Sequence, residues 1–189
     1  LFPQFPNIFT MRGEKVRHPV AYLRSLEMVM ELDPVMIVPS HKAPIDDVSM
    51  IQDGMKKIYE ATRFVHDQTI AGMNAGKTVE QLMAEIKLPE DLQLTQEHGK
   101  VSWAVKSIWE YYATWFHFDK TTELYEVPAT AVYKDIIDAA GVDVLLSKAN
   151  AHLDIEQPLH ALHLLDMLLS VEPDSKPVLT AQKSAFDTL

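Results

Sequence analysis

Val35-Met-Ile-Val-Pro-Ser-His41 is the stretch from which the organisation of this 189-residue chain can be read. Its first four residues are apolar and mostly β-branched, which predicts a short, fully buried β-strand. Pro39 ends the run because proline has no N–H to donate to a sheet. We therefore expect His41 on a loop at the carboxyl end of a strand, the edge where α/β proteins bind ligands and metals.

A helix is predicted just before this strand, from about Pro19 to Leu32, with Asp33-Pro34 ending it. One helix and one strand cannot bury their own faces, so this unit needs a sheet that the chain does not contain. The segment from Leu1 to Phe9 is extended and rich in aromatic residues. Such a segment is costly to leave in water unless another part of the protein covers it.

Nearly everything after His41 reads as helix. Asp46 or Asp47 can cap a long helix that runs to about Asn74, and Thr78 with Gln81 forms a capping box for a short one. The long helix carries apolar or small residues at alternating spacings of three and four, a narrow seam typical of a helix lying against another helix. The seam residues are Val48, Ile51, Met55, Ile58, Thr62, Val65 and Thr69. We interpret this seam as fit for burial against a second subunit.

A further helix is predicted from Gly99, leading into the aromatic cluster Trp115-Phe-His-Phe118. Beyond Pro128 the pattern predicts helices over residues 129–140, 142–153, 157–171 and 175–188. The spacing of the last three is typical of a tetratricopeptide-like array, in which helix pairs bury one face by stacking on neighbours. The predicted fold class is mainly α, with a short αβ remnant at the start.

Composition excludes several classes of function. The formal net charge of −10 argues against nucleic acid or an anionic membrane as the main partner. The absence of cysteine excludes disulfides, thiolate ligands and a cysteine nucleophile. No apolar run approaches the roughly 20 residues of a membrane span. The cellular compartment is not determined by these features.

Eight histidines invite a metal-site interpretation, but few are grouped. His160 and His163 are three residues apart on a helix, yet no third ligand is evident nearby, so a structural role is favoured. His66, followed by Asp67, can pair with a partner helix or support a site. His41 stands out by its placement, since a neutral imidazole at a strand end is a good zinc ligand, but one ligand cannot make a site.

Arg12 precedes a glycine. Its planar guanidinium group can donate two hydrogen bonds at once to a sulfate, a phosphate or a carboxylate. The alternative is a salt bridge to one of the 27 acidic residues. His18, His117 and His152 read as structural or surface residues.

Several motifs, taken in order, resemble the alkylsulfatases of the metallo-β-lactamase superfamily. The motifs are Asn7-Ile-Phe-Thr-Met-Arg-Gly13, Pro39-Ser-His41, Val65-His-Asp-Gln-Thr69, Gly99-Lys-Val-Ser102, Trp115-Phe116 and Leu168-Leu-Ser-Val-Glu-Pro-Asp174. The resemblance covers essentially the whole chain, and the order and spacing of the motifs carry it. It implies that residues 1–46 are the carboxyl-terminal part of a metallo-β-lactamase-like αββα domain. Residues 47–189 are then the all-helical dimerisation domain.

The resemblance also implies a function for the parent protein, which is zinc-dependent hydrolysis of alkyl sulfate-like esters by a homodimer. His41 matches the last zinc-ligand histidine of a two-zinc centre, and Arg12 matches an arginine that grips the substrate sulfate. A periplasmic or secreted location is compatible with the family.

Two departures from the family pattern matter. The His-x-His-x-Asp-His motif that supplies most of the metal ligands is absent, so this chain alone is expected to be inactive. His98 stands before Gly99, where the family commonly has a tyrosine that contacts the sulfate. An imidazole can still donate a hydrogen bond to an anion. The change leaves open which ester the parent enzyme cleaves. The alternative interpretation is a non-catalytic helical interaction module of tetratricopeptide type.

Overall fold

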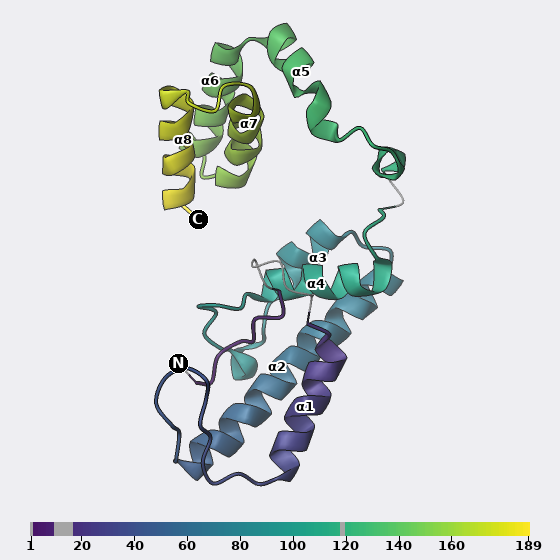
Figure 1. The fold of residues 1–189 in the computed structure, drawn as a ribbon, viewed down its shortest axis with the longest axis vertical. Helices are drawn as coiled ribbons and strands as arrows, with labels where there is room; N and C mark the ends of the chain where they lie inside the picture. The colour runs from purple at the N-terminus through teal and green to yellow at the C-terminus, as the bar shows by residue number, and fades with distance from the viewer. Residues whose placement is uncertain (1, 10–16, 118–119) are drawn as a thin grey trace. The chain divides into compact units, whose positions relative to one another are not determined.

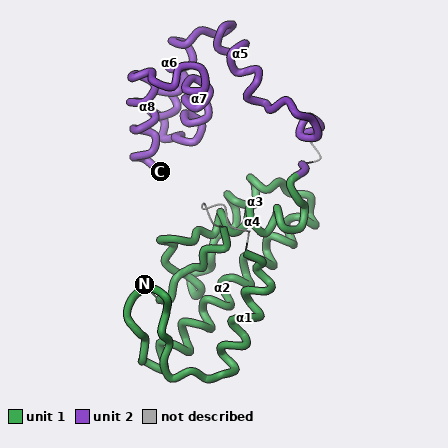
Figure 2. The backbone as a smooth tube through the Cα atoms, viewed as in Figure 1, with its two compact units in different colours: residues 1–115 green, residues 116–189 purple. Residues whose placement is uncertain are grey.

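The computed structural model describes residues 2–9, 17–117 and 120–189, and these residues form helices joined by loops and short 3-10 turns (Figure 1). The chain divides into two compact units, Leu1–Trp115 and Phe116–Leu189, coloured separately in Figure 2. The mainly helical fold class predicted from the sequence is confirmed. The predicted domain boundary after residue 46 concerns the longer parent protein and stays a prediction.

The first unit contains four α-helices and one 3-10 turn among its described residues. They are α1 (Pro19–Glu31), α2 (Val48–Asn74), α3 (Val79–Glu85), η1 (Glu90–Leu92) and α4 (Val101–Ala113). Local sequence explains where these helices begin. The Asp47 carboxylate accepts the Met50 N–H at 3.0 Å, and Thr78 and Gln81 make the reciprocal bonds of a capping box. The corresponding predictions are confirmed.

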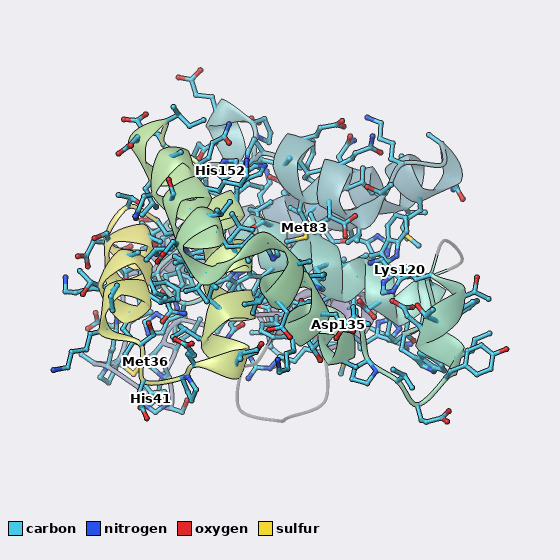
Figure 3. All side chains as sticks on the ribbon, turned by 90° about the horizontal axis from the view of Figure 1, so that it is seen from above. Met36, His41, Met83, Lys120, Asp135 and His152 are labelled. Atoms are coloured by element: carbon cyan, nitrogen blue, oxygen red, sulfur yellow. The ribbon has the colours of Figure 1, made fainter. Side chains whose placement is uncertain are left out.

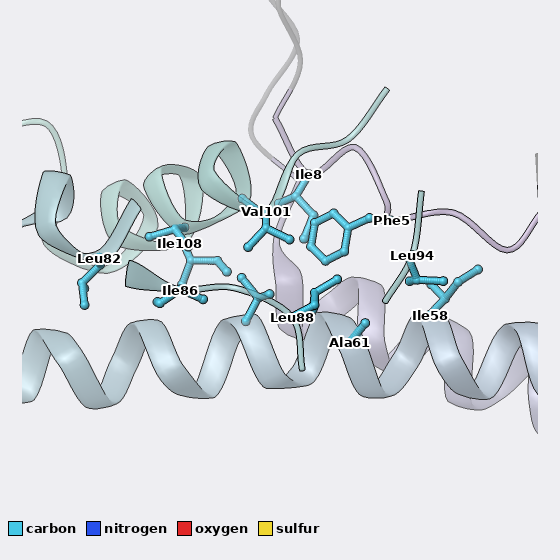
Figure 4. Packing of buried hydrophobic residues seen from close by; sticks show 13 residues of the cluster. Phe5, Ile8, Ile58, Ala61, Leu82, Ile86, Leu88, Leu94, Val101 and Ile108 are labelled. Carbon is cyan, nitrogen blue, oxygen red and sulfur yellow. The ribbon is translucent and has the colours of Figure 1, made fainter. Parts of the chain in front are cut away.

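The core of this unit lies along α2, where apolar side chains of α3, α4 and the amino-terminal segment converge (Figure 4). Phe5 and Ile8 of that segment are almost completely buried, beside Val101 and Ile108 of α4. The α2 seam from Ile51 to Thr69 is buried here, as its periodicity predicts. The side chains that pack on the seam, however, belong to the same chain. The interpretation that this seam is buried against a second subunit is therefore wrong.

Gly99 permits a close approach between the amino-terminal segment and the start of α4. A Cβ atom at this position would lie 2.3 Å from the carbonyl oxygen of Pro6. This oxygen belongs to the backbone, so no side-chain rotation can relieve the clash. A parallel bridge between Gln4 and Thr95 holds the same two segments together. Glycine is thus required by packing at Gly99 rather than by an unusual backbone angle.

The predicted buried strand over residues 35–38 is not what the structure shows. Ile37 and Ile45 exchange two backbone hydrogen bonds of 2.8 and 2.9 Å, an isolated antiparallel bridge within the loop between α1 and α2. Val35 is 70% exposed and Val38 73% exposed. The reason is physical: no second strand lies beside this segment in the described part of the chain, so its apolar side chains have nothing to pack against.

The second unit begins with an irregular segment that leads into four packed helices. Its elements are η2 (Thr121–Leu124), η3 (Ala129–Val132), α5 (Tyr133–Ala140), α6 (Val142–Asp154), α7 (Pro158–Val171) and α8 (Lys176–Asp187). Gly141 separates α5 from α6 with a φ of 88°, in the left-handed region that favours glycine. Consecutive helices pack on one another around small buried residues such as Ala149, Ala161 and Ala185. The tetratricopeptide likeness stays a prediction.

None of the helices in the described ranges combines the length and the hydropathy needed to cross a membrane.

Candidate functional site

His41, the predicted metal ligand, lies on the exposed loop between α1 and α2, five residues beyond Met36 (Figure 3). Its imidazole is exposed and makes no hydrogen bond or ion pair to other described residues. Nowhere in the described residues do three or more His, Cys, Asp or Glu side chains gather in a way that could hold a metal ion. The residues present therefore do not fit a zinc centre by themselves, because a zinc site takes three or four protein ligands.

Of the two predicted substrate-binding residues, His98 has no contact with His41 among the described residues. Arg12 lies outside the described residues. His98 is exposed on the turn just before α4, next to the buried Gly99. The roles of Arg12, His41 and His98 stay predictions.

The most developed polar cluster of the first unit lies in a groove between α1 and α2, with a volume of about 420 Å³. Leu23 and Val20 contribute apolar surface, and the charged side chains that line it alternate in sign. They are Arg24 and Glu27 from α1 and Arg63 and Asp67 from α2. The groove is open to solvent, and its two arginines are matched by the two carboxylates of Glu27 and Asp67.

Hydrogen bonds link the polar side chains of this groove into a chain across helices. The Tyr59 hydroxyl donates to Oε1 of Glu27 at 2.6 Å, and Arg63 donates to the Tyr59 oxygen at 3.4 Å. Arg63 also pairs with Asp67, Nε to Oδ2, at 3.5 Å. The carboxylate of Glu27 raises the pKa of Tyr59 above its ordinary value, because the hydrogen bond favours the neutral phenol.

His66 extends this chain to α4. Its Nδ1 lies 2.9 Å from Oδ1 of Asp67, and its Nε2 lies 2.9 Å from the hydroxyl oxygen of Tyr112. The prediction that His66 pairs with a neighbouring helix agrees with this contact. Sequence reasoning missed Glu27, Tyr59 and Arg63. The four-residue spacing of Tyr59, Arg63 and Asp67 along α2 is a signal that could have found part of the cluster.

The other histidines have structural surroundings. His18 caps α1 by accepting N–H groups at Nδ1, and His117 binds the carboxylate of Glu123. His152 stacks on His160 with their ring centroids 5.2 Å apart, and Nδ1 of His152 bonds Gln157. His163 is exposed on α7. None of these side chains belongs to a metal-binding group in the part of the chain that the structure describes.

Large apolar side chains are exposed along two stretches of the described chain. One runs from the end of α1 into the following loop, and the other follows the start of the second unit. The first comprises Met28, Val29, Leu32, Val35, Met36 and Val38; the second comprises Leu124, Tyr125, Val127, Val132 and Ile136. Where exposed apolar side chains form a contiguous patch, they commonly mark a site of interaction with another protein.

The described residues thus form a helical chain with a buried central helix and exposed apolar side chains on α1 and its following loop and at the start of the second unit. The chain belongs to the alkyl sulfatase dimerisation family, whose family model matches residues 78–189. This match confirms the family resemblance seen in the sequence. The lactamase-like edge predicted for residues 1–46 lies outside the match.

Individual relatives agree with this assignment. The chain is 30% identical over 158 residues to a linear primary-alkylsulfatase of a Pseudomonas species, a match that covers 80% of this chain and 30% of the relative. It is 23% identical over 151 residues to an alkyl/aryl-sulfatase of Saccharomyces cerevisiae, covering 76% of this chain and 23% of that protein. The chain thus spans less than a third of the curated relatives that it matches.

Among solved structures, the fold is similar to that of a stereoselective inverting sec-alkylsulfatase from Pseudomonas sp.. The TM-score is 0.87 at 21% identity, and the similarity covers 99% of this chain and 31% of that one. Both described units therefore have counterparts in a known alkylsulfatase fold.

Proposed function

We propose that this chain is the helical dimerisation part of an alkylsulfatase-like hydrolase of sulfuric esters, and that two copies associate through it. The family match over residues 78–189 carries the proposal. The names of the curated relatives supply the reaction class, since each is called a sulfatase.

The first exposed apolar cluster supports a place for residues 1–46 at the edge of a larger domain. Val35 and Val38 are exposed although their sequence pattern is that of an interior strand. We infer that these side chains pack against a lactamase-like sheet elsewhere in the parent protein. Burying them contributes stability at about 25 cal/mol per Å² of apolar surface.

In this proposal His41 is one ligand of a two-zinc centre whose remaining donors belong to the rest of that domain. Arg12 and His98 are proposed to bind the sulfate group of the substrate by charge-assisted hydrogen bonds. The described residues supply a single imidazole to the metal centre, so no chemical step is assigned to this chain.

The dimerisation role is tested by the mass of the chain in solution. Sedimentation equilibrium over about 1 to 100 µM is expected to fit a monomer–dimer model, with the dimer predominant at the upper end of that range. A chain that stays at the monomer mass of 21.4 kDa throughout that range overturns the role.

The enzymatic role is tested in the parent protein with decyl sulfate, by measuring the sulfate released and the zinc bound. We expect about two zinc ions per chain, as in other two-metal sites, and a loss of zinc on His41→Ala. His163→Ala is the matched control, because His163 is also an exposed histidine. Unchanged zinc in His41→Ala removes this residue from the centre, and absence of sulfate release from the wild-type protein overturns the reaction class.

A further inference from the structure

The loop between α1 and α2, residues 32–47, contains two residues other than glycine with left-handed backbone angles, and we call it the His41 loop. Asp33 has a φ of 44° and Lys42 a φ of 74°. L-residues rarely adopt such angles, because the Cβ atom crowds the backbone. The short polar side chain of aspartate eases this crowding, but the long side chain of lysine does not. Lys42 therefore has a conformation that its own preference does not explain, directly after His41, which Figure 3 labels.

Backbone hydrogen bonds close the loop around this point. Ile37 and Ile45 exchange two bonds of 2.8 and 2.9 Å in an antiparallel bridge. The chain must reverse its direction between these two residues, and a residue with positive φ is a common way to do so. His41 and Lys42 both lie inside this closed turn. The bridge thus explains why the left-handed angle at Lys42 is kept.

Side-chain contacts hold both ends of the loop against α2. Gln52 donates from Nε2 to Oδ1 of Asp33 at 2.8 Å, at the start of the loop. At its end, Asp47 accepts the Met50 N–H at 3.0 Å and the Ser49 hydroxyl at 2.7 Å. These two bonds lower the pKa of Asp47, because they favour the charged carboxylate. The loop is therefore anchored at both ends within the first unit.

A residue in an unfavourable backbone conformation persists only where the surrounding structure determines it, and such residues cluster at functional sites. The exposed imidazole of His41 makes no hydrogen bond or ion pair to other described residues, so its own contacts do not fix its direction. The backbone of the turn is what remains to set that direction. This observation points to Lys42, the neighbouring residue with the unusual angle.

We propose that Lys42 is a positioning residue, whose left-handed backbone, held by the bridge between Ile37 and Ile45, sets the direction in which the His41 side chain leaves the loop before any metal binds. The inference rests on the proposed function, in which His41 is a zinc ligand, and it adds the residue that orients this ligand. A ligand that is already in place loses less conformational freedom when the ion binds. The role belongs to the backbone angle of Lys42 and not to its ammonium group.

The proposal predicts that substitutions of Lys42 rank by their tolerance of a positive φ and not by charge. Lys42→Gly and Lys42→Asn tolerate this angle although both remove the charge, whereas the β-branched side chain of Lys42→Val does not. The readout is hydrogen exchange in the metal-free chain at the amides of Ile37 and Ile45, which donate the two bridge bonds. We expect exchange rates within about 3-fold of wild type for the glycine and asparagine variants and rates about 10-fold higher or more for valine.

The second readout is the zinc affinity of the parent protein, measured by competition with a chelator. The same ranking is expected, with Lys42→Gly and Lys42→Asn close to wild type and Lys42→Val about 10-fold weaker, as when a group that orients a metal ligand is lost. Glu156 is the matched control, because it is an exposed non-glycine residue with a φ of 56° in the turn between α6 and α7. Glu156→Val should speed exchange of its own amide, which bonds the Leu153 carbonyl at 3.1 Å, and leave zinc affinity within about 3-fold of wild type.

The outcomes separate this inference from the proposed function. Zinc affinity that falls equally in the glycine, asparagine and valine variants assigns the effect to the ammonium group and overturns the positioning role. Unprotected amides at Ile37 and Ile45 in the wild-type chain overturn it as well, since the turn is then not formed in advance. A wild-type parent that binds no zinc overturns the metal role of His41, and the exchange ranking alone then decides whether Lys42 determines the shape of the loop.

Discussion

Tyr59 of α2 donates a 2.6 Å hydrogen bond to Oε1 of Glu27 on α1, and this bond connects residues 32 positions apart in the chain. It joins the helix that precedes the His41 loop to the helix that follows it. The position of that loop therefore depends in part on a side-chain contact that lies on the open side of the α1–α2 groove.

Replacing Tyr59 with phenylalanine is expected to lower the midpoint of urea unfolding at pH 8. Because the pKa of Tyr59 is raised above 10.0 in the folded chain, its contribution to stability is fully present below pH 10 and is lost as the pH rises through the folded-state pKa. The difference between wild type and Tyr59→Phe should therefore shrink at high pH. Unfolding curves measured from pH 8 to about 11 check this, and a difference that stays constant contradicts it.

The contact between His66 and Tyr112 is expected to couple α2 to α4. A double-mutant cycle with His66→Ala and Tyr112→Phe should give a coupling free energy of about 0.5–1 kcal/mol, the usual range for a hydrogen bond that is partly open to solvent. The matched control is the exposed pair Lys56 and Glu60, whose charged atoms are 3.9 Å apart on α2, and its cycle should give a coupling near zero. Equal coupling in the two cycles removes the specific role of His66.

Helix positions in this chain could be predicted because their signals are local. The Asp47 cap, the capping box of Thr78 and Gln81, and Pro19 in the first turn of α1 each act within a few residues. The seam of α2 was also predicted correctly as a buried stripe, except at its first residue, Val48, which is 39% exposed. The residues that pack against this stripe were not predicted correctly. A stripe buried by the same chain and a stripe buried by a second subunit have the same periodicity, so the sequence pattern does not distinguish them.

The candidate site was less predictable for a similar reason. The run from Val35 to Val38 has the pattern of an interior strand, but a strand needs neighbours, and none is present beside it in the described residues. The pairing of Tyr59 with Glu27 depends on the packing of α1 against α2, which no local pattern encodes. His41 was singled out by its place after the apolar run, Arg12 by its guanidinium beside a glycine, and His98 by the family resemblance alone; their roles remain predictions.

Gly99→Ala tests the packing of the amino-terminal segment on α4. The new methyl group would meet the Pro6 carbonyl at 2.3 Å, so the backbone must shift, and overpacking of this kind costs about 1–3 kcal/mol. Lys100→Ala is the neighbouring control, because Lys100 is exposed, and it should change stability by less than about 0.5 kcal/mol. If both variants unfold at the same denaturant concentration as wild type, residues 2–9 do not pack on Gly99 as described.

Leu165→Ala tests whether the two compact units have independent cores. Leu165 is fully buried in a cluster formed by residues of the second unit alone, while Phe5, Ile58 and Ile108 belong to a separate cluster of the first. Removing the buried leucine side chain is expected to destabilise the second unit by about 2–5 kcal/mol. Because no residue is shared between the clusters, native-state hydrogen exchange should accelerate in α6, α7 and α8 and remain near wild type in α2 and α4. Ile108→Ala is the reciprocal variant and should reverse that pattern; acceleration throughout the chain in either variant would show that the units unfold as one.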